Sequence, residues 1–193
     1  MSQVTAIVLA AGGSCRMGQP KQLLAVAGQS LLRRAVQLAM EVADSTIVVL
    51  GARAELLANE LHDLDVTIVL NNAWQMGMGT SVRAGMSDIP PSAEAVLFVL
   101  CDQPQVTSAH LRDLIQAWRS SGHPIAASGY EGVAGVPALF SRSCFADLMS
   151  LDPRSGAKQL LQARPQAVAV VPFDEAANDI DTPEDYRLTL LGG

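Results

Sequence analysis

A short segment near the amino terminus combines small residues with positive charge. It contains, in order, Gly12, Gly13, Ser14, Arg16 and Lys21. Backbone N–H groups in a glycine loop can form a nest for anions. A guanidinium binds phosphate oxygens bidentately, and an ammonium acts as a mobile point charge. Lysine is scarce, because Lys21 and Lys158 are the only two in the chain. The loop therefore predicts a phosphate site, although a glycine turn with incidental surface cations is the simpler alternative.

Two common phosphate-binding motifs do not match this loop. The glycine spacing from Gly13 to Gly18 fits a Walker A motif, but Gln19 stands where that motif requires lysine. Gly12 and Gly13 also do not supply the G-x-G-x-x-G pattern of a dinucleotide-binding loop. The loop therefore belongs to neither class.

Acidic residues follow at two places that could hold a metal ion. Asp102 comes directly after the most apolar run of the chain, 95–100, where open α/β sheets bind ligands. Asp179 and Asp181 alternate about Ile180, so an extended chain points both carboxylates the same way. Carboxylate oxygens suit Mg²⁺. The alternatives are turn or helix-cap residues, and we favour Asp181 over Asp179 as the second ligand.

Hydrophobic patterning predicts alternating strands and helices. We expect strands at 5–9, 46–50, 66–70, 95–100, 124–128, 136–140 and 168–171, with 95–100 at the sheet centre. Helices are expected from Ser30 to about 41, over 54–62, from a cap near Thr80, from a Ser108 cap to about 120, from 156, and from Thr182 with Pro183 and Asp185. A glycine-rich turn is expected at 129–135. This order predicts a mostly parallel sheet covered by helices on both faces.

Composition narrows the functional class. Hydrophobic residues make up 49% of the 193 residues and aromatics only 4%, so the core must be aliphatic. A net charge of −6 argues against nonspecific binding to nucleic acid or an anionic membrane. Cys15, Cys101 and Cys144 are an odd, scattered set, which fits reduced thiols in a cytoplasmic protein. We expect a monomer without a signal peptide or membrane span.

A second polar loop lies at 71–85 and leads into a helix. Gly79 and Ser81 are candidates for binding a nucleotide base, and an ordinary strand-to-helix loop is the alternative. Trp74 is expected to pack the loop rather than stack on a base.

These segments together resemble the MobA-like nucleotidyltransferases. The first reads L-A-A-G-G-x-x-x-R-M-G-x-P-K from Leu9, the second G-M-G-T-S-V-R-A-G, and the last, within 178–186, D-I-D-T-P-E-D. L-C-D-Q-P at 100–104 resembles the molybdenum cofactor cytidylyltransferases in particular. The resemblance implies one Rossmann-like three-layer α/β/α domain of the nucleotide-diphospho-sugar transferase type over 1–193. Its NTP-binding half would be about 1–105 and its acceptor-binding half about 106–193.

The resemblance also implies a reaction and a set of site residues. CMP would pass from CTP to the terminal phosphate of molybdenum-bound molybdopterin, with Mg²⁺ as cofactor and pyrophosphate as the second product. Arg16, Lys21 and Asp102 would be catalytic, and Asp102 and Asp181 would bind metal. The nucleotide would contact Leu9, Ala10, Ala11, Gly12, Gly13, Ser14, Arg16, Lys21, Gly79 and Ser81. A molybdenum hydroxylase is a possible client for the product.

Several alternatives stay open. The substrate could be GTP or another phosphorylated acceptor, although guanylyltransferase relatives carry Gly where this chain has Ala11. Some relatives are linked to oxidoreductase activity, and a non-catalytic cofactor-delivery protein is a further reading. Family members often show G-D-x-G-A where this chain has Pro153–Ala157, which lacks the acid. Lys158 could bind acceptor phosphate or lie on a solvated helix face.

Overall fold

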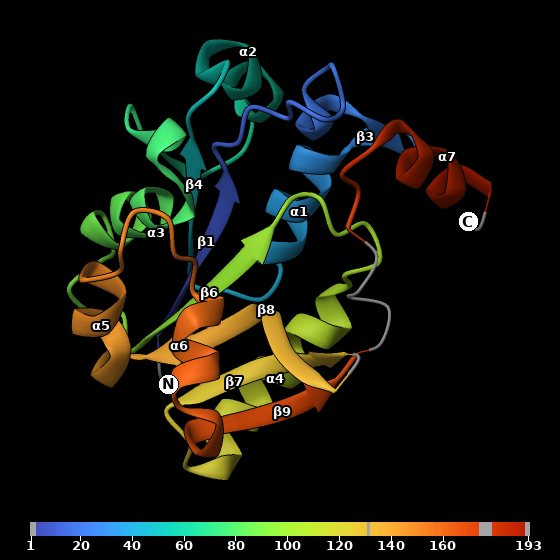
Figure 1. Cartoon of the computed structure of the whole chain (residues 1–193). Helices are drawn as coiled ribbons and strands as arrows, with labels where there is room; N and C mark the ends of the chain where they lie inside the picture. Colours follow the sequence, from blue (N-terminus) through green and yellow to red (C-terminus); the bar gives the residue numbers. More distant parts are fainter. Residues whose placement is uncertain (1–2, 131, 174–178, 192–193) are drawn as a thin grey trace.

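The computed structural model describes residues 3–130, 132–173 and 179–191. Its main sheet has seven strands in the order β5-β4-β1-β6-β8-β7-β9 (Figure 1). The strands are β1 (Val4–Ala10), β4 (Ser45–Leu50), β5 (Thr67–Leu70), β6 (Ala95–Leu100), β7 (Ile125–Tyr130), β8 (Val133–Ser141) and β9 (Val168–Pro172). β8 runs antiparallel to its neighbours β6 and β7, and the other adjacent pairs are parallel. The mostly parallel sheet is confirmed.

The helices lie between the strands in the chain, as expected. They are α1 (Leu31–Met40), α2 (Ala54–Ala58), α3 (Met78–Ser87), α4 (Ser108–Ser121), α5 (Phe145–Met149), α6 (Lys158–Ala163) and α7 (Pro183–Leu191). Single 3₁₀ turns are η1 (Lys21–Leu23), η2 (Asn59–Leu61), η3 (Trp74–Met76), η4 (Arg142–Cys144) and η5 (Pro165–Ala167). Among the described residues, no helix has the length and apolar character to cross a membrane.

The central position of β6 is confirmed, and it explains the apolar run. β6 pairs with β1 on one side, with Ile7 opposite Phe98, and with β8 on the other. Every residue of β1 is buried, and β6 is buried except at Leu100. Strands that helices cover on both faces read as continuous apolar runs.

Successive residues of β1 face two different cores. Ala6 and Val8 pack with residues of α1, α2 and α4 on one face, and Ile7 and Leu9 pack with residues of α3, α5 and α6 on the other. The period of two in a strand therefore builds both helix layers from one segment. The three-layer α/β/α arrangement is confirmed (Figure 1).

Helix starts follow the predicted chemistry with small displacements. The Ser30 hydroxyl caps α1 by accepting from Arg33 N at 3.2 Å, as predicted. The cap of α4 is Thr107, one residue before the predicted Ser108. The prediction of a helix cap near Thr80 is wrong. Helix α3 begins at Met78, and the Thr80 hydroxyl donates back to Gly77 O at 2.7 Å.

Two hairpins differ from expectation. The predicted turn over 129–135 is shorter, because β7 continues to Tyr130 and β8 begins at Val133; residue 131 lies outside the described residues. A small hairpin, β2 (Ala25–Val26) with β3 (Gln29–Ser30), had no sequence prediction. Its turn places Ala27 and Gly28 at positive φ, 51° and 82°.

The segment before α7 docks onto the amino-terminal loop. Ile180 is fully buried and forms a small core with Met17, Leu24 and Leu31. Its N–H also donates to Asp102 O at 2.9 Å. The capping box of α7 is confirmed: the Asp185 carboxylate accepts from Thr182 N at 2.7 Å, and Asp185 N donates to the Thr182 hydroxyl at 3.3 Å. Residue 178, which opens the predicted motif 178–186, lies outside the described residues.

Candidate active site

The carboxyl ends of β1 and β6 place the predicted residues at one edge of the sheet. The glycine loop follows Ala10, and Asp102 lies two residues after Leu100. Because Ile180 is fixed against Asp102 O, the next residue, Asp181, reaches the same edge. Three segments far apart in sequence therefore meet there.

A cluster of four charged side chains joins these segments. Lys21 Nζ donates to Asp102 Oδ2 at 2.5 Å and to Asp181 Oδ1 at 2.9 Å. Arg16 Nη2 donates to the other oxygen of Asp181, Oδ2, at 2.8 Å. Exposed fractions are 16% for the Lys21 side chain and 15% for Asp102, against 71% for Arg16. The ammonium thus lies between two carboxylates at a largely buried position.

The electrostatics keep the Lys21–Asp181 contact ionised at neutral pH. Burial alone would lower the pKa of Lys21, but the Asp102 and Asp181 carboxylates together raise it above its ordinary value. Hydrogen bonding from Lys21, followed by the charges of Lys21 and Arg16, holds the pKa of Asp181 below its usual range.

Asp179 lies near this cluster but bonds a different partner. Its Oδ1 accepts from the side-chain amide of Gln103 at 3.1 Å. Desolvation, with a second contribution from the negative charge of Asp102, raises the pKa of Asp179 to about 6. Its environment therefore disfavours the ionised form, whereas that of Asp181 favours it.

A buried glutamine that the sequence reading did not single out shapes the glycine loop. Gln22 Nε2 donates to Ala10 O at 3.1 Å and to Gly12 O at 2.7 Å. The Ser14 hydroxyl donates to Gln22 Oε1 and accepts from Lys21 N, both at 3.1 Å, with Ser14 at a φ of 52°. The position of Gln22 beside the apolar Leu23-Leu24 pair is the feature of the sequence that could have indicated a buried glutamine. These bonds occupy the Ser14 side chain within the loop itself.

A small cavity of about 110 Å³ opens beside this loop. Its lining combines the end of β1 with the loop before α3: Leu9, Ala11, Gly12, Trp74, Gly77, Met78 and Ser81. The Ser81 hydroxyl accepts from Asn71 Nδ2 at 3.0 Å, and that amide also donates to Thr80 Oγ1 at 2.8 Å. Asn71, buried directly after β5, is a second positioning residue that sequence reasoning missed.

Trp74 lines this cavity, and Gly79 lies in the helix start beside it. A Cβ on Gly13 would lie 3.0 Å from the Trp74 ring, so the indole packs against the glycine loop as well as lining the cavity. Gly79 N already donates to Pro153 O at 3.0 Å, and a Cβ on Gly79 would lie 2.1 Å from Asp152 O. Gly79 therefore permits close packing of loop 152–155, and its N–H is not free for a nucleotide.

The donor set at the cluster fits a hard divalent cation. Asp102 Oδ1 is buried, and no residue described in the structure donates to it. Burying an unpaired carboxylate oxygen is unfavourable unless a cation or donor completes it. Within the described ranges, no group of three or more His, Cys, Asp or Glu side chains could hold a metal. The protein therefore offers two carboxylates, and phosphate and water oxygens would complete a Mg²⁺ shell.

The thiol of Cys101, the residue before Asp102, is not a candidate nucleophile. Burial, with a smaller contribution from the charge of Asp102, raises the pKa of Cys101 to about 12. A neutral buried thiol is a poor nucleophile. All three cysteines are free, as the sequence predicted.

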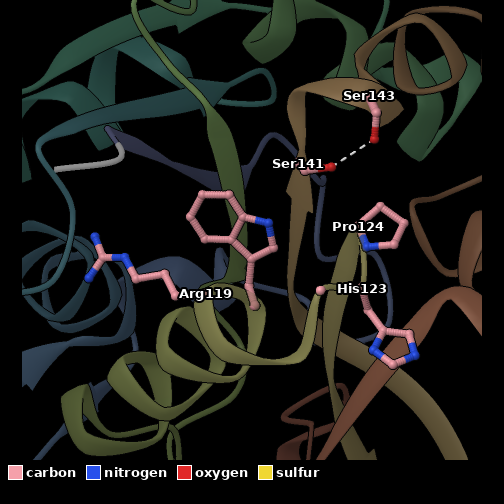
Figure 2. Close-up of a pocket in the computed structure, with 7 residues that line it drawn as sticks. Arg119, His123, Pro124, Ser141 and Ser143 are labelled. Atoms are coloured by element: carbon pink, nitrogen blue, oxygen red, sulfur yellow. Dashed lines mark hydrogen bonds between the residues drawn. The ribbon is translucent and has the colours of Figure 1, made fainter.

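A larger hollow of about 700 Å³ lies at the other end of the sheet (Figure 2). It is lined by the end of α4, the start of β7 and the end of β8, which is the amino-terminal edge of the parallel strands. Ser141 and Ser143 bond to each other at 2.8 Å, while Arg119 and His123 point away from them. These side chains do not converge on one point, so the charged cluster is the better candidate site.

Comparison with known proteins identifies the family and fold of this chain. The model of the MobA-like NTP transferase domain matches residues 6–169. Molybdenum cofactor cytidylyltransferase of Escherichia coli is 27% identical over 191 residues, covering 96% of this chain and 95% of that protein. Nicotine blue oxidoreductase of Paenarthrobacter nicotinovorans is 28% identical over 200 residues, covering 96% of each. Rv0371c of Mycobacterium tuberculosis H37Rv, solved in complex with manganese, is 28% identical with a TM-score of 0.80 over 100% of both chains. The chain belongs to the MobA-like NTP transferase domain family and is a nucleotidyltransferase with the nucleotide-diphospho-sugar transferase fold.

Proposed function

We propose that this nucleotidyltransferase moves CMP from CTP to the terminal phosphate of molybdenum-bound molybdopterin and releases pyrophosphate. The observation that carries the proposal is the Lys21–Asp102–Asp181 cluster, which lies beside a glycine loop and a small cavity. The similarity to the cytidylyltransferase of Escherichia coli supports the choice of nucleotide and acceptor.

The chemistry requires charge neutralisation more than proton transfer. The acceptor phosphate and CTP are both polyanions, so they repel each other as they approach the α-phosphorus. Lys21 and Arg16 would neutralise phosphate oxygens and stabilise charge that develops on the leaving pyrophosphate. The acceptor phosphate is already a nucleophile, so no strong general base is needed. Catalysis would then rest mainly on positioning and electrostatics.

Asp102 and Asp181 would hold the divalent cation, which we propose is Mg²⁺. The buried oxygen of Asp102 that has no partner in the described part of the chain supports this assignment, and the manganese in Rv0371c is consistent with it. When bound, Mg²⁺ would act as a Lewis acid on phosphate oxygens. Asp179 is the weaker candidate, because its carboxylate binds Gln103 instead of Lys21.

The small cavity would receive the base. Leu9, Ala11 and Gly12 form one wall and Ser81 another, so the pocket offers backbone groups and one hydroxyl. A volume of about 110 Å³ favours a pyrimidine over a larger purine. Gly13 and Ser14 would contribute to binding through the loop backbone.

The second half of the chain would receive the acceptor. We propose residues 106–193 for this role. Asp181 also lies in this half, but it would bind the metal ion together with Asp102. Lys158, exposed at the start of α6, is a candidate contact for the acceptor phosphate. The product would serve a molybdenum hydroxylase in the cytoplasm, and the enzyme would act as a monomer.

The direct test measures pyrophosphate release from CTP with Mg²⁺ and molybdenum-bound molybdopterin. Asp102→Asn should lower kcat roughly a hundredfold or more, because the transition state loses an anionic metal ligand. Asp181→Asn should lower it less, and Asp179→Asn is the matched control with the smallest effect. An unchanged melting temperature would show that the fold is retained. Near wild-type turnover of Asp102→Asn at saturating Mg²⁺ would refute the assignment.

Two rival functions predict different outcomes. An NAD-dependent oxidoreductase would bind a dinucleotide and release no pyrophosphate; the loop lacks the dinucleotide fingerprint, which disfavours this reading. A delivery protein would bind the cytosine dinucleotide product without forming it. An enzyme that used another phosphate ester as acceptor, or GTP as donor, would still be a nucleotidyltransferase and would differ only in its substrate.

A further inference from the structure

We propose that Lys21 is an exchangeable cation: it neutralises Asp102 and Asp181 until a divalent metal ion takes these carboxylates, and it then moves to the phosphates of the nucleotide. This proposal rests on the proposed function, because it assigns the two carboxylates to a metal. It adds that Lys21 and the metal compete for the same two carboxylates.

The observed arrangement places the ammonium of Lys21 where a metal ion shared by the two carboxylates would lie. Lys21 Nζ lies 2.5 Å from Asp102 Oδ2 and 2.9 Å from Asp181 Oδ1, so it already bridges the two carboxylates. A metal ion that used the same oxygens would lie within a few ångströms of the ammonium. Two like charges at that separation in a largely buried site repel strongly. Lys21 must therefore leave these oxygens when a metal binds them.

The backbone of Lys21 is fixed, so only its side chain has to move. Lys21 N donates to the Ser14 hydroxyl at 3.1 Å, and Lys21 begins the short helix η1. The ammonium therefore stays within reach of the glycine loop, whose N–H groups would hold phosphates. A flexible four-carbon stem suits such a movement, and a planar guanidinium fork does not.

Arg16 provides the internal comparison. Among the described residues its side chain bonds Asp181 alone, through Oδ2, and it is 71% exposed. It does not bridge the two carboxylates, so it blocks metal binding less. Removing Arg16 should therefore change metal affinity less than removing Lys21, although both residues carry one positive charge.

The proposal predicts that metal affinity and activity change in opposite directions. Without Lys21, a metal ion no longer has to displace an ammonium held by two charge-assisted hydrogen bonds. Lys21→Met should therefore bind Mn²⁺ about tenfold or more tightly than the wild type in the absence of nucleotide. The same variant should release pyrophosphate more slowly, because the phosphates lose their cation.

The experiment measures free Mn²⁺ by electron paramagnetic resonance during titration of the protein without nucleotide. Tighter binding by Lys21→Met and Lys21→Gln, a smaller gain for Arg16→Gln, and loss of binding for Asp102→Asn would support the exchange. Unchanged or weaker Mn²⁺ binding by both Lys21 variants, with wild-type circular dichroism, would overturn it. Tighter Mn²⁺ binding without pyrophosphate release by the wild type would reject the proposed reaction and retain the exchange.

Discussion

Gln22 donates its side-chain amide to the carbonyl oxygen of Gly12 at 2.7 Å, from a position that is only 2% exposed. The same amide reaches Ala10 O, so one side chain ties the end of β1 to the turn that follows it. The conformation of the nucleotide loop therefore depends on a residue that would not itself touch the nucleotide.

Gln22→Leu should destabilise the protein and weaken nucleotide binding. The substitution removes the Gln22 donor from the carbonyls of Ala10 and Gly12, which costs about 1–3 kcal/mol where they are buried. Thermal unfolding should show a lower melting temperature, and the KM for CTP should rise more than kcat falls. Ser14→Ala, which removes bonds to Gln22 and Lys21 N, should have a smaller effect. A wild-type KM in Gln22→Leu would contradict a role in shaping the loop.

Two glycine substitutions should separate packing from nucleotide binding. A Cβ on Gly79 would lie 2.1 Å from Asp152 O, whereas a Cβ on Gly12 has no heavy atom within 4 Å. Gly79→Ala should therefore lower stability, by about 1–3 kcal/mol or more, through overpacking. Gly12→Ala should keep the melting temperature and raise the KM for CTP, because the methyl group points into space that the nucleotide needs. Equal KM values for Gly12→Ala and wild type would place the nucleotide elsewhere.

Ala11→Gly should relax base selectivity without reversing it. Ala11 lines the cavity with Ser81, and its methyl group reduces the room for a purine. One methyl group shifts discrimination by about 1–3 kcal/mol, or roughly 10–200-fold. The measurement is kcat/KM for CTP and GTP with one acceptor, in wild type and variant. Equal use of both nucleotides by the wild type would reject cytidylyl specificity and leave nucleotidyl transfer intact.

An ion pair away from the site gives a pH-dependent stability test. Arg33 binds both oxygens of Asp63, at 2.8 and 2.7 Å, and this holds the pKa of Asp63 at about 2 against an ordinary value of 3.8. A depressed carboxyl pKa stabilises the folded state above the unfolded value and loses this contribution as pH falls. The melting temperature of wild type should exceed that of Asp63→Asn at pH 6, and the difference should shrink between pH 4 and 2.

Salt provides the control for this ion pair. The Asp63 side chain is 47% exposed, so 1 M NaCl should reduce the difference at pH 6. A difference that is independent of both pH and salt would show that the variant acts through packing instead.

The sheet and the charged residues could be predicted from sequence because local patterns encode them. Buried strands read as apolar runs, and the cations and carboxylates stand in short motifs at strand ends. The partners of these residues could not be predicted in the same way. The clash that requires glycine at position 79 comes from the backbone of Asp152, 73 positions later, and no local pattern reports it. The start of α3 shifted for a similar reason: loop 152–155 packs against it, and Gly77 suits that contact.

The docking of Ile180 has a consequence for when the site forms during synthesis of the chain. Lys21 and Asp102 are synthesised early, but Asp181 reaches them only after the chain has passed Asp102 by 79 residues. Contacts of such long sequence separation form late, because closing the intervening chain costs entropy. A nascent chain that already holds the glycine loop and β6 therefore lacks one of the two carboxylates of the proposed metal site. Partly made or carboxyl-terminally clipped molecules lack Asp181, so we expect them to turn over nucleotide slowly even where the glycine loop has formed.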